Sequence, residues 1–436
     1  MDQHILLRHR DIENIHEIDV YLQHGGYEAL KKAISMGPDA VINEVKASNL
    51  RGRGGAGFPA GVKWSFIPKD EPIKYVVVNA DESEPGTFKD REILEKNPHQ
   101  LLEGALIAAY AIQAKAVYIY CRGEFWDLTH ELDKHIEAAR EKGFIGENIL
   151  DSGWSCEVYT HLGAGAYICG EETALLNSLQ GLLGQPRVRP PFPAQKGGGL
   201  YYEATVVNNV ETLTNVPWII TNGADAYKQI GTPESPGPKI YCLSGHVARP
   251  GNYELPLGVT FRELIFEHAG GIPDDRKLKA ILPSGASGPV LPATDEVLDT
   301  PLTYEAVAAI GSTLGSASII LMDETVNMAW AAGKMMQFFS HESCGKCTPC
   351  REGTYWTKMR FKSLLGGKLQ DEKDIDTIGD VAGQMAGLTL CALGEFAVNP
   401  VVATIKHFRE DYLEYLQKPE QEAKGAKKPA REKAPA

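Results

Sequence analysis

The sequence has no apolar stretch long enough to cross a lipid bilayer. Its longest apolar run, from Ala105 to Ile112, is far shorter than the roughly 18 to 20 residues that a membrane-spanning helix needs. The first residues, Met1 to Val20, alternate charged and apolar side chains and lack the apolar core of a secretory signal. These absences predict a cytoplasmic protein that meets a membrane only indirectly, through partner proteins.

The chain also lacks an excess of positive charge. Its 436 residues carry a formal net charge of −13, which argues against a nucleic-acid-binding surface. Hydrophobic residues make up 43% of the chain and aromatic residues 8%, as in ordinary globular proteins. Because the chain is longer than one hydrophobic core usually fills, we expect about two to four domains.

Cysteine is scarce, and none occurs before Cys121. In a reducing compartment the eight cysteines are poor disulfide candidates and better metal ligands. Four of them stand alone, and most of these are interpreted as buried small apolar residues: Cys121, Cys156, Cys169 and Cys242.

The other four cysteines form the strongest motif of the chain. Cys344-Gly-Lys-Cys347-Thr-Pro-Cys350 places three thiols on one stretch of backbone, and the distant Cys391 can complete the set. This three-plus-one spacing is typical of a [4Fe-4S] cluster, whereas zinc sites typically use two separated pairs. We interpret the four cysteines as ligands of one cluster, with zinc as the competing interpretation. Because a cluster moves single electrons, the chain is interpreted as one stage of an electron relay.

The order of the expected elements indicates an α/β fold with a mostly parallel, Rossmann-like sheet. Short apolar runs at 73–79, 116–121 and 157–161 predict strands, and the segments 98–113, 129–142 and 171–179 predict the helices between and after them. Prolines and glycines at 184–199 predict an extended surface loop.

Changes in composition predict the domain boundaries. Prolines and glycines crowd at 231–238, a strand-rich region follows, and from Asp323 the sequence becomes helical around the cysteines. We therefore expect an N-terminal helical segment with a glycine-rich loop (1–70), an α/β domain (71–237), a small separate domain (238–323), a helical domain with the cluster (324–418) and a disordered tail (419–436).

A first glycine-rich loop contains Gly52, Gly54 and Gly57 in a formal G-x-G-x-x-G pattern. A helical segment precedes it where a Rossmann fingerprint requires a strand, and Phe58 stands where a Walker loop requires lysine. Glycines still let backbone amides approach a ligand, and Arg51, Arg53 and Lys63 add the positive charge that a phosphate or flavin requires. An ordinary tight loop is the alternative.

Two further segments carry polar groups at the ends of expected strands or the start of a helix. The strand at 73–79 runs into Asn79-Ala-Asp81-Glu-Ser83-Glu84, at the kind of sheet edge where α/β proteins bind ligands. A solvated acidic turn is the alternative there. The glycine loop at 163–170 leads into Glu171 and Glu172, which either bind a ribose and repel a 2′-phosphate or merely cap a helix.

Together these segments resemble the flavin- and NADH-binding subunit of respiratory complex I, the NADH:quinone oxidoreductase. The resemblance rests on the segments 51–59, 79–86, 163–172 and 342–352, and it spans roughly residues 20 to 415. It implies three cofactors, FMN, NAD(H) and a [4Fe-4S] cluster. It also implies that the small domain is a β-grasp module and that the C-terminal helices form the bundle that holds the cluster.

The resemblance assigns roles to individual residues. It implies that FMN is held by Gly52, Arg53, Gly54, Lys63, Asn79, Asp81, Ser83, Gly170, Asn208, Asn209 and Thr212. It implies that Glu84, Tyr167, Glu171 and Glu172 line the nicotinamide and ribose, with Glu84, Tyr167 and Glu172 as the catalytic residues. Phe58, Phe66 and Phe192 match residues that stack on adenine, although each alone would be interpreted as a core residue.

The implied function is hydride transfer from NADH to FMN, followed by transfer of single electrons to the cluster and through partner subunits to quinone. The implied partners are a small thioredoxin-like [2Fe-2S] subunit and a large iron-sulfur subunit, on the peripheral arm of a membrane-bound complex. A related alternative is the diaphorase subunit of an NAD-linked hydrogenase or formate dehydrogenase. A more distant alternative is a zinc-stabilised scaffold that binds nucleotide without turnover.

Overall fold

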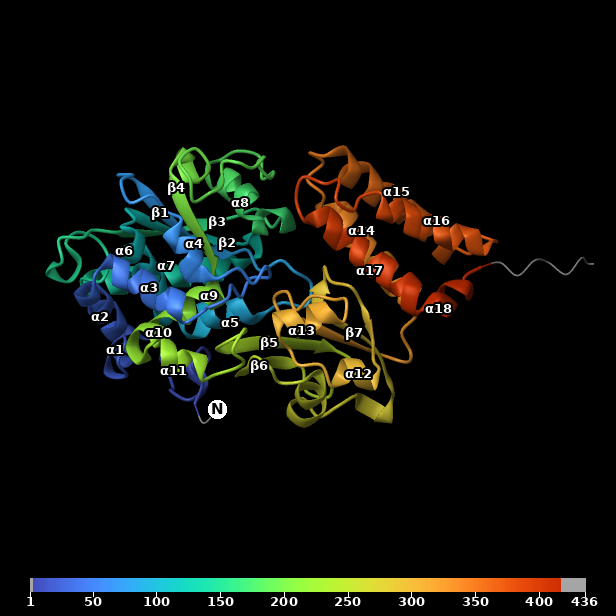
Figure 1. Cartoon of the computed structure of the whole chain (residues 1–436), viewed down its shortest axis with the longest axis horizontal. Helices are drawn as coiled ribbons and strands as arrows, with labels where there is room; N and C mark the ends of the chain where they lie inside the picture. Colours follow the sequence, from blue (N-terminus) through green and yellow to red (C-terminus); the bar gives the residue numbers. More distant parts are fainter. Residues whose placement is uncertain (1–2, 417–436) are drawn as a thin grey trace, which may run out of the picture.

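A computed structural model describes residues 3–416 of the chain. The tail predicted over 419–436 lies outside the described residues. Figure 1 shows three regions: a sheet surrounded by helices in blue to green, a second sheet in yellow, and a helical region in orange to red. The predicted fold class is confirmed, because the first sheet is parallel, the second is mixed and the C-terminal region is helical.

The first sheet sets the position of the site. Its strands are β1 (Lys74–Ala80), β2 (Ala116–Cys121), β3 (Glu157–Leu162) and β4 (Ala204–Asn209), all parallel, in the order β3-β2-β1-β4. The chain moves outward from β1 to β3 and then returns to the other side of β1 as β4. The order therefore reverses between β1 and β4, and such a switch point is where open α/β sheets bind ligands at the carboxyl ends of the strands.

Helices cover the first sheet and extend its core. They are α1 (Ile18–Gln23), α2 (Glu28–Met36), α3 (Pro38–Ala47), α4 (Ala60–Ser65), α5 (Lys89–Lys96), α6 (Pro98–Ile112), α7 (Trp126–Glu141), α8 (Glu172–Leu179), α9 (Val210–Thr214), α10 (Val216–Asn222) and α11 (Ala224–Lys228). Every residue of α6 is buried, including the polar His99, Gln100 and Glu103 in its first half.

Successive side chains of β1 pack into two separate hydrophobic cores. Val76 and Val78 belong to the core that contains α6, whereas Val77 belongs to a second core that contains Leu175 of α8 and Phe339 of the C-terminal region. Successive side chains of a strand point to opposite faces of the sheet, so one strand serves both cores. The second face of the parallel sheet thereby connects to the helical region that carries the cysteine motif.

The second sheet is mixed. It contains β5 (Pro238–Gly245), β6 (Gly251–Pro256), β7 (Leu278–Ala286), β8 (Leu291–Pro292) and β9 (Ser318–Asp323), in the order β6-β5-β9-β7-β8. β5 and β9 are parallel, and the other neighbours are antiparallel. Its own core includes Phe261, Leu264 and Leu302, and the short helices α12 (Asp295–Leu298) and α13 (Tyr304–Ala309) lie in the same region.

The C-terminal region consists of α14 (Met328–Glu342), α15 (Thr348–Leu365), α16 (Glu372–Gly383), α17 (Leu393–His407) and α18 (Arg409–Leu413). Asn327 caps α14, and Asp371 and Asp374 form a capping box on α16. Phe339, Phe361 and Val401 are buried between these helices. Across residues 3–416, we find no helix with the length and apolar character needed to span a membrane.

Candidate functional site at the strand ends and the cysteine motif

The first glycine loop lies against the carboxyl end of β4. The Gly52 amide donates to the Phe58 carbonyl (2.9 Å), which closes the loop, and the Arg53 amide donates to Oγ1 of Thr212 (2.8 Å). A Cβ on Gly54 would lie 2.9 Å from Cβ of Asn209, so no larger residue fits at this position without a shift. Glycine is therefore required at position 54 to bring the backbone amides of the loop close to the sheet.

The carboxyl end of β1 joins this sheet edge to the second glycine loop. Asn79 donates through Nδ2 to the Gly170 carbonyl (2.8 Å), and its Oδ1 accepts from the Asp81 amide (3.1 Å). Oδ1 of Asp81 in turn accepts from the Ser83 hydroxyl (2.6 Å). The four predicted residues thus form one hydrogen-bonded group at the switch point of the sheet.

One atom of this group lacks a partner. Oδ2 of Asp81 is buried and accepts no hydrogen bond, and burial raises the pKa of Asp81 to about 7. A buried acceptor without a donor is costly, and it is readily satisfied by a donor group of a bound ligand. A sugar-like hydroxyl, such as those on the ribityl chain of a flavin, is suitable. The residues at this edge therefore fit FMN.

Glu84 and Tyr167 form a partly buried, hydrogen-bonded pair. The Tyr167 hydroxyl donates to Oε2 of Glu84 (2.8 Å), and the Ser287 amide donates to Oε1 (3.0 Å). Burial raises the pKa of Glu84 to about 7, and burial together with Glu84 raises the pKa of Tyr167 well above its ordinary value. The amide of Tyr167 also donates to Oε2 of Glu342 (3.0 Å), at the end of α14.

Glu171 and Glu172 make different contacts at the start of α8. Oε2 of Glu171 accepts from the amides of Thr173 and Ala174 (both 2.9 Å), so Glu171 is the N-cap of the helix. Oε2 of Glu172 instead pairs with Nζ of Lys63 at 2.7 Å. Burial alone would raise the pKa of Glu172, but Lys63 and Arg189 lower it below its ordinary value.

Arg189 belongs to this site and was missed in the sequence. Its guanidinium pairs with Oε1 of Glu171 through Nη2 and lies 3.4 Å from Oε1 of Glu172 through Nη1. The one signal that could have pointed to it is its place in the basic run Arg187-Val188-Arg189, directly before two prolines. Nothing local to that run indicates that it faces α8.

Several predicted site residues use their side chains in hydrogen bonds to other residues of the protein. The Arg53 guanidinium is fully buried and donates to the Pro236 carbonyl (2.8 Å) and the Tyr227 hydroxyl (3.2 Å), so only its backbone faces the loop. Nδ2 of Asn209 donates to Asp90, and Oδ1 accepts from Lys89 and the Glu211 amide. Oδ1 of Asn208 accepts from the Trp64 indole (2.8 Å).

The three predicted aromatic residues are exposed, so none of them is a core residue. Phe58 is 48% exposed, Phe66 56% and Phe192 49%. The rings of Phe58 and Phe66 lie 6.2 Å apart at an angle of 45°. Exposed phenylalanines of this kind provide apolar surface for a planar ligand such as adenine.

The four motif cysteines gather at the tip of the C-terminal helices. Cys347 directly precedes α15 and Cys350 lies in its first turn, while Cys391 lies just before α17. Burial, together with the nearby Glu171, Cys344 and Cys350, raises the pKa of the Cys391 thiol to about 11. The four cysteines outside the motif are all buried, as predicted.

Within residues 3–416, no group of three or more His, Cys, Asp or Glu side chains is arranged to hold one metal ion. A zinc site would need its ligands about 2.3 Å from a single ion, whereas a [4Fe-4S] cluster spreads its thiolates around a cube. The donor set of the motif, three closely spaced cysteines and a distant fourth, is the one that a [4Fe-4S] cluster uses.

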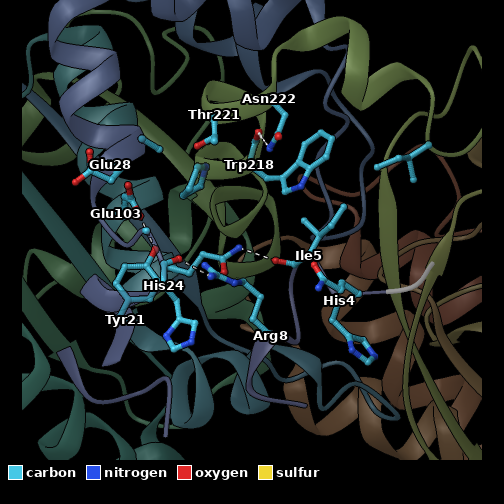
Figure 2. Close-up of a pocket in the computed structure, with 16 residues that line it drawn as sticks. His4, Ile5, Arg8, Tyr21, His24, Glu28, Glu103, Trp218, Thr221 and Asn222 are labelled. Atoms are coloured by element: carbon cyan, nitrogen blue, oxygen red, sulfur yellow. Dashed lines mark hydrogen bonds between the residues drawn. The ribbon is translucent and has the colours of Figure 1, made fainter. Parts of the chain in front are cut away.

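A cavity of about 570 Å³ lies apart from this site (Figure 2). Trp218 and Asn222 lie on one side of it, and Tyr21, His24 and Arg8 lie on the other. None of the predicted site residues lines it. The predicted residues therefore form an open edge of the parallel sheet rather than this cavity.

Comparison with known proteins agrees with both halves of the site. Residues 45–218 match the family described as the Nuo51 FMN-binding domain, and residues 330–415 match the iron-sulfur binding region of NADH-ubiquinone oxidoreductase-F. Residues 240–291, in the second sheet, match the SLBB domain. The first family match contains both glycine loops, and the second contains all four motif cysteines.

Full-length relatives agree with these matches. The F subunit of the NADH-quinone oxidoreductase of Streptomyces coelicolor is 51% identical over 92% of this chain and 88% of its own length. The corresponding F 2 subunit of the NADH-quinone oxidoreductase of Rhizobium meliloti is 48% identical over 96% of this chain and 98% of its own length.

A solved structure of an NAD⁺-reducing [NiFe]-hydrogenase in the H₂-reduced state matches with a TM-score of 0.81 and 39% identity. The match covers 88% of this chain but spans only 63% of the hydrogenase chain. The two NADH-quinone oxidoreductase relatives match over nearly their whole length, and the two cofactor regions follow in the same order. The chain therefore belongs to the F-subunit family of NADH-quinone oxidoreductases, with an FMN-binding domain and a [4Fe-4S]-binding region.

Proposed function

We propose that this chain is the NADH-oxidising module of a quinone-reducing complex. It catalyses hydride transfer from NADH to non-covalent FMN and passes single electrons to a [4Fe-4S] cluster. The observation that carries this proposal is the chain of contacts from Glu84 through Tyr167 to Glu342, which joins the sheet edge to the helix that leads into the cysteine motif. The nucleotide side and the cluster side are thus adjacent in space.

FMN is held by the sheet edge. The backbone of the loop at Gly52 to Gly54 approaches the ligand, and Asp81 offers the unpartnered oxygen Oδ2. Lys63 supplies positive charge near this edge. When bound, FMN accepts a hydride and gives up the two electrons one at a time. The chain's own residues act mainly by orienting the two ring systems, because hydride transfer between them requires no strong acid or base.

Glu84 and Tyr167 position the nicotinamide side of the substrate. The proton of the Tyr167 hydroxyl is held toward Oε2 of Glu84, so the pair presents a fixed donor and acceptor pattern. The amide of Ser287 holds the other carboxylate oxygen in place. Because the pKa of Glu84 is raised to about 7, its charge is sensitive to small changes in its surroundings at neutral pH.

Glu172 recognises the ribose of the nucleotide. A carboxylate at this position accepts from ribose hydroxyls and repels a 2′-phosphate, so we expect NADH to be strongly preferred over NADPH. Glu171 has a supporting role, because one of its oxygens caps α8. Phe58, Phe66 and Phe192 offer exposed rings for the adenine.

The cluster is bound by Cys344, Cys347, Cys350 and Cys391. We infer that electrons leave this cluster for partner subunits, namely a small thioredoxin-like [2Fe-2S] subunit and a large iron-sulfur subunit. These would lie with this chain on the cytoplasmic peripheral arm of a membrane-bound complex. We also propose the division of the chain at residues 70, 237, 323 and 418, which keeps each sheet and the helical region in separate units.

The direct test is NADH:ferricyanide activity measured on anaerobically purified protein in which FMN, iron and acid-labile sulfide are quantified. We expect activity with about one FMN and about four iron atoms per chain, as a single [4Fe-4S] cluster requires. Folded protein that contains zinc instead of iron and no FMN would contradict the proposal.

The second candidate is the diaphorase subunit of an NAD-linked hydrogenase, which performs the same half-reaction. The likeness to the hydrogenase structure favours it, at 39% identity and a TM-score of 0.81. Affinity purification from the native cells separates the two. Co-purification with quinone-reducing activity supports the first candidate, and co-purification with H₂-dependent NAD⁺ reduction supports the second.

A further inference from the structure

Two cations converge on the two glutamates at the start of α8. Lys63 comes from α4, and Arg189 comes from the proline-rich loop that follows α8. Glu172 contacts both of them, with Oε2 at 2.7 Å from Lys63 and Oε1 at 3.4 Å from Arg189. Two positive and two negative side chains therefore neutralise one another at the proposed ribose subsite.

The position of Arg189 is built into the loop. Its neighbour Arg187 donates its amide to the Thr173 hydroxyl (2.8 Å) and its guanidinium to the carbonyls of Gly198 (3.0 Å) and Gly199 (2.9 Å). Lys346, within the cysteine motif, donates to the Pro186 carbonyl (2.6 Å). These contacts fix the loop directly before Arg189, and after it the Thr205 amide donates to the Pro193 carbonyl (2.8 Å). The loop thereby holds the Arg189 guanidinium at the start of α8.

Resting on the proposed nucleotide site, we propose that Arg189 is a specificity-determining residue that Glu171 and Glu172 together keep occupied. Glu172 discriminates against a 2′-phosphate in two ways. Its negative charge repels the phosphate, and its pairing with Arg189 and Lys63 removes the two cations that would otherwise bind the phosphate. Arg189 is a latent phosphate-binding group, because its planar guanidinium suits bidentate contact with phosphate oxygens.

A neutral residue at position 172 distinguishes loss of repulsion from gain of attraction. If the substitution only removed repulsion, the nucleotide that carries a 2′-phosphate would bind about as tightly as the nucleotide that lacks it. A neutral residue at 172 frees Lys63 and leaves Arg189 with Glu171 as its remaining ionic partner. Both cations then add attraction, so the phosphorylated nucleotide should become the tighter ligand. We expect Arg189 to account for most of that attraction, because its planar guanidinium suits bidentate contact with a phosphate.

The experiment measures binding of 5′-AMP and of 2′,5′-ADP to the cofactor-containing protein by titration calorimetry, without turnover. The ratio of the two dissociation constants reports the 2′-phosphate alone. We expect wild type to bind 5′-AMP more tightly. We expect Glu172→Gln to shift the ratio toward 2′,5′-ADP by about tenfold or more, the size of a charged hydrogen bond.

The double variant Glu172→Gln with Arg189→Met decides the matter. We expect it to lose most of the shift, whereas the control Glu172→Gln with Arg262→Met should keep it, because Arg262 pairs with Asp295 and Asp299 far from this site. A shift that is equally large with and without Arg189 overturns the inference and leaves the nucleotide site intact. Failure of wild type to bind 5′-AMP at all would instead overturn the proposed site.

Discussion

The two sheets of this chain differ in whether one edge gathers the polar residues of the proposed site. All four strands of the first sheet are parallel, so their carboxyl ends meet at one edge, and that edge gathers Asn79, Asp81 and Asn209. The second sheet mixes strand directions, so its polar groups are divided between both edges. It meets the proposed catalytic pair at the end of β7, where the Ser287 amide donates to Glu84.

The parallel sheet gathers the candidate site residues at one edge, whereas the mixed sheet mainly supports the fold. Glu254 of β6 illustrates the supporting role, because its carboxylate accepts from three successive amides of the N-terminal segment. Glu211 joins the two sheets, since it accepts from the β5 amide of Ile240 (2.8 Å) and from Nζ of Lys239 (2.5 Å). Substitutions should therefore affect ligand binding at the parallel sheet and the stability provided by the mixed sheet separately.

The largest effect is expected at the junction between the sheets. Glu211→Gln leaves Lys239 buried without its ionic partner and should lower the free energy of unfolding by about 3 to 5 kcal/mol. Chemical denaturation measures this change. The exposed Glu147→Gln is the matched control and should leave the unfolding midpoint unchanged.

A smaller effect, confined to the parallel sheet, is expected at the first glycine loop. Gly54→Val places side-chain atoms against Asn209, where even a Cβ would lie 2.9 Å away, and should lower FMN affinity about tenfold or more. Fluorescence titration of FMN-depleted protein measures the affinity. Gly251→Val, at the start of β6, is the comparison, because nothing lies within 4 Å of a Cβ there and its backbone is not left-handed. Equal FMN affinity in both variants would remove the assigned role of this loop.

The complementary change affects the mixed sheet. Glu254→Gln removes one acceptor for the amides of Ile5, Leu6 and Leu7 and should cost about 1 to 3 kcal/mol of stability. The rate of NADH oxidation per bound FMN should stay the same. The exposed Glu267→Gln controls for charge, and a loss of activity in Glu254→Gln without loss of stability would break the division of roles.

The smallest effect concerns pH and the buried carboxyl at the parallel edge. Burial raises the pKa of Asp81 from 3.8 to about 7, so the protonated form is favoured in the folded state. Its stabilising contribution is present below pH 3.8 and is lost as the pH rises toward 7.

Asp81→Asn should remove that dependence and raise the stability of FMN-depleted protein at pH 8 relative to pH 5, by on the order of 1 kcal/mol compared with wild type. Thermal unfolding at the two pH values measures this difference. The same pH dependence in variant and wild type would show that Asp81 does not titrate in this range.

Local patterns predicted much of the fold correctly. The apolar run at 116–121 coincides with β2, and the expected helix at 171–179 corresponds to α8, which begins one residue later. These elements follow from the spacing of apolar residues and from helix-starting groups, which depend only on near neighbours. The exposure of Phe192, the burial of Arg53 and the contact of Arg189 with Glu171 depend on distant segments, and local patterns do not encode them.

By itself the sequence determined which chemistry this chain could hold. Cysteine spacing, glycine content and the polar ends of apolar runs set the ligands and loops, because backbone and spacing constraints act over a few residues. Only the tertiary structure decided how these parts meet. The fold brings Lys63 of α4 to Glu172 across more than a hundred residues, and the packing of Tyr167 against Phe338 and Phe339 of α14 brings Glu342 to Tyr167. Such contacts arise from burying both faces of one sheet, which no short stretch of sequence specifies.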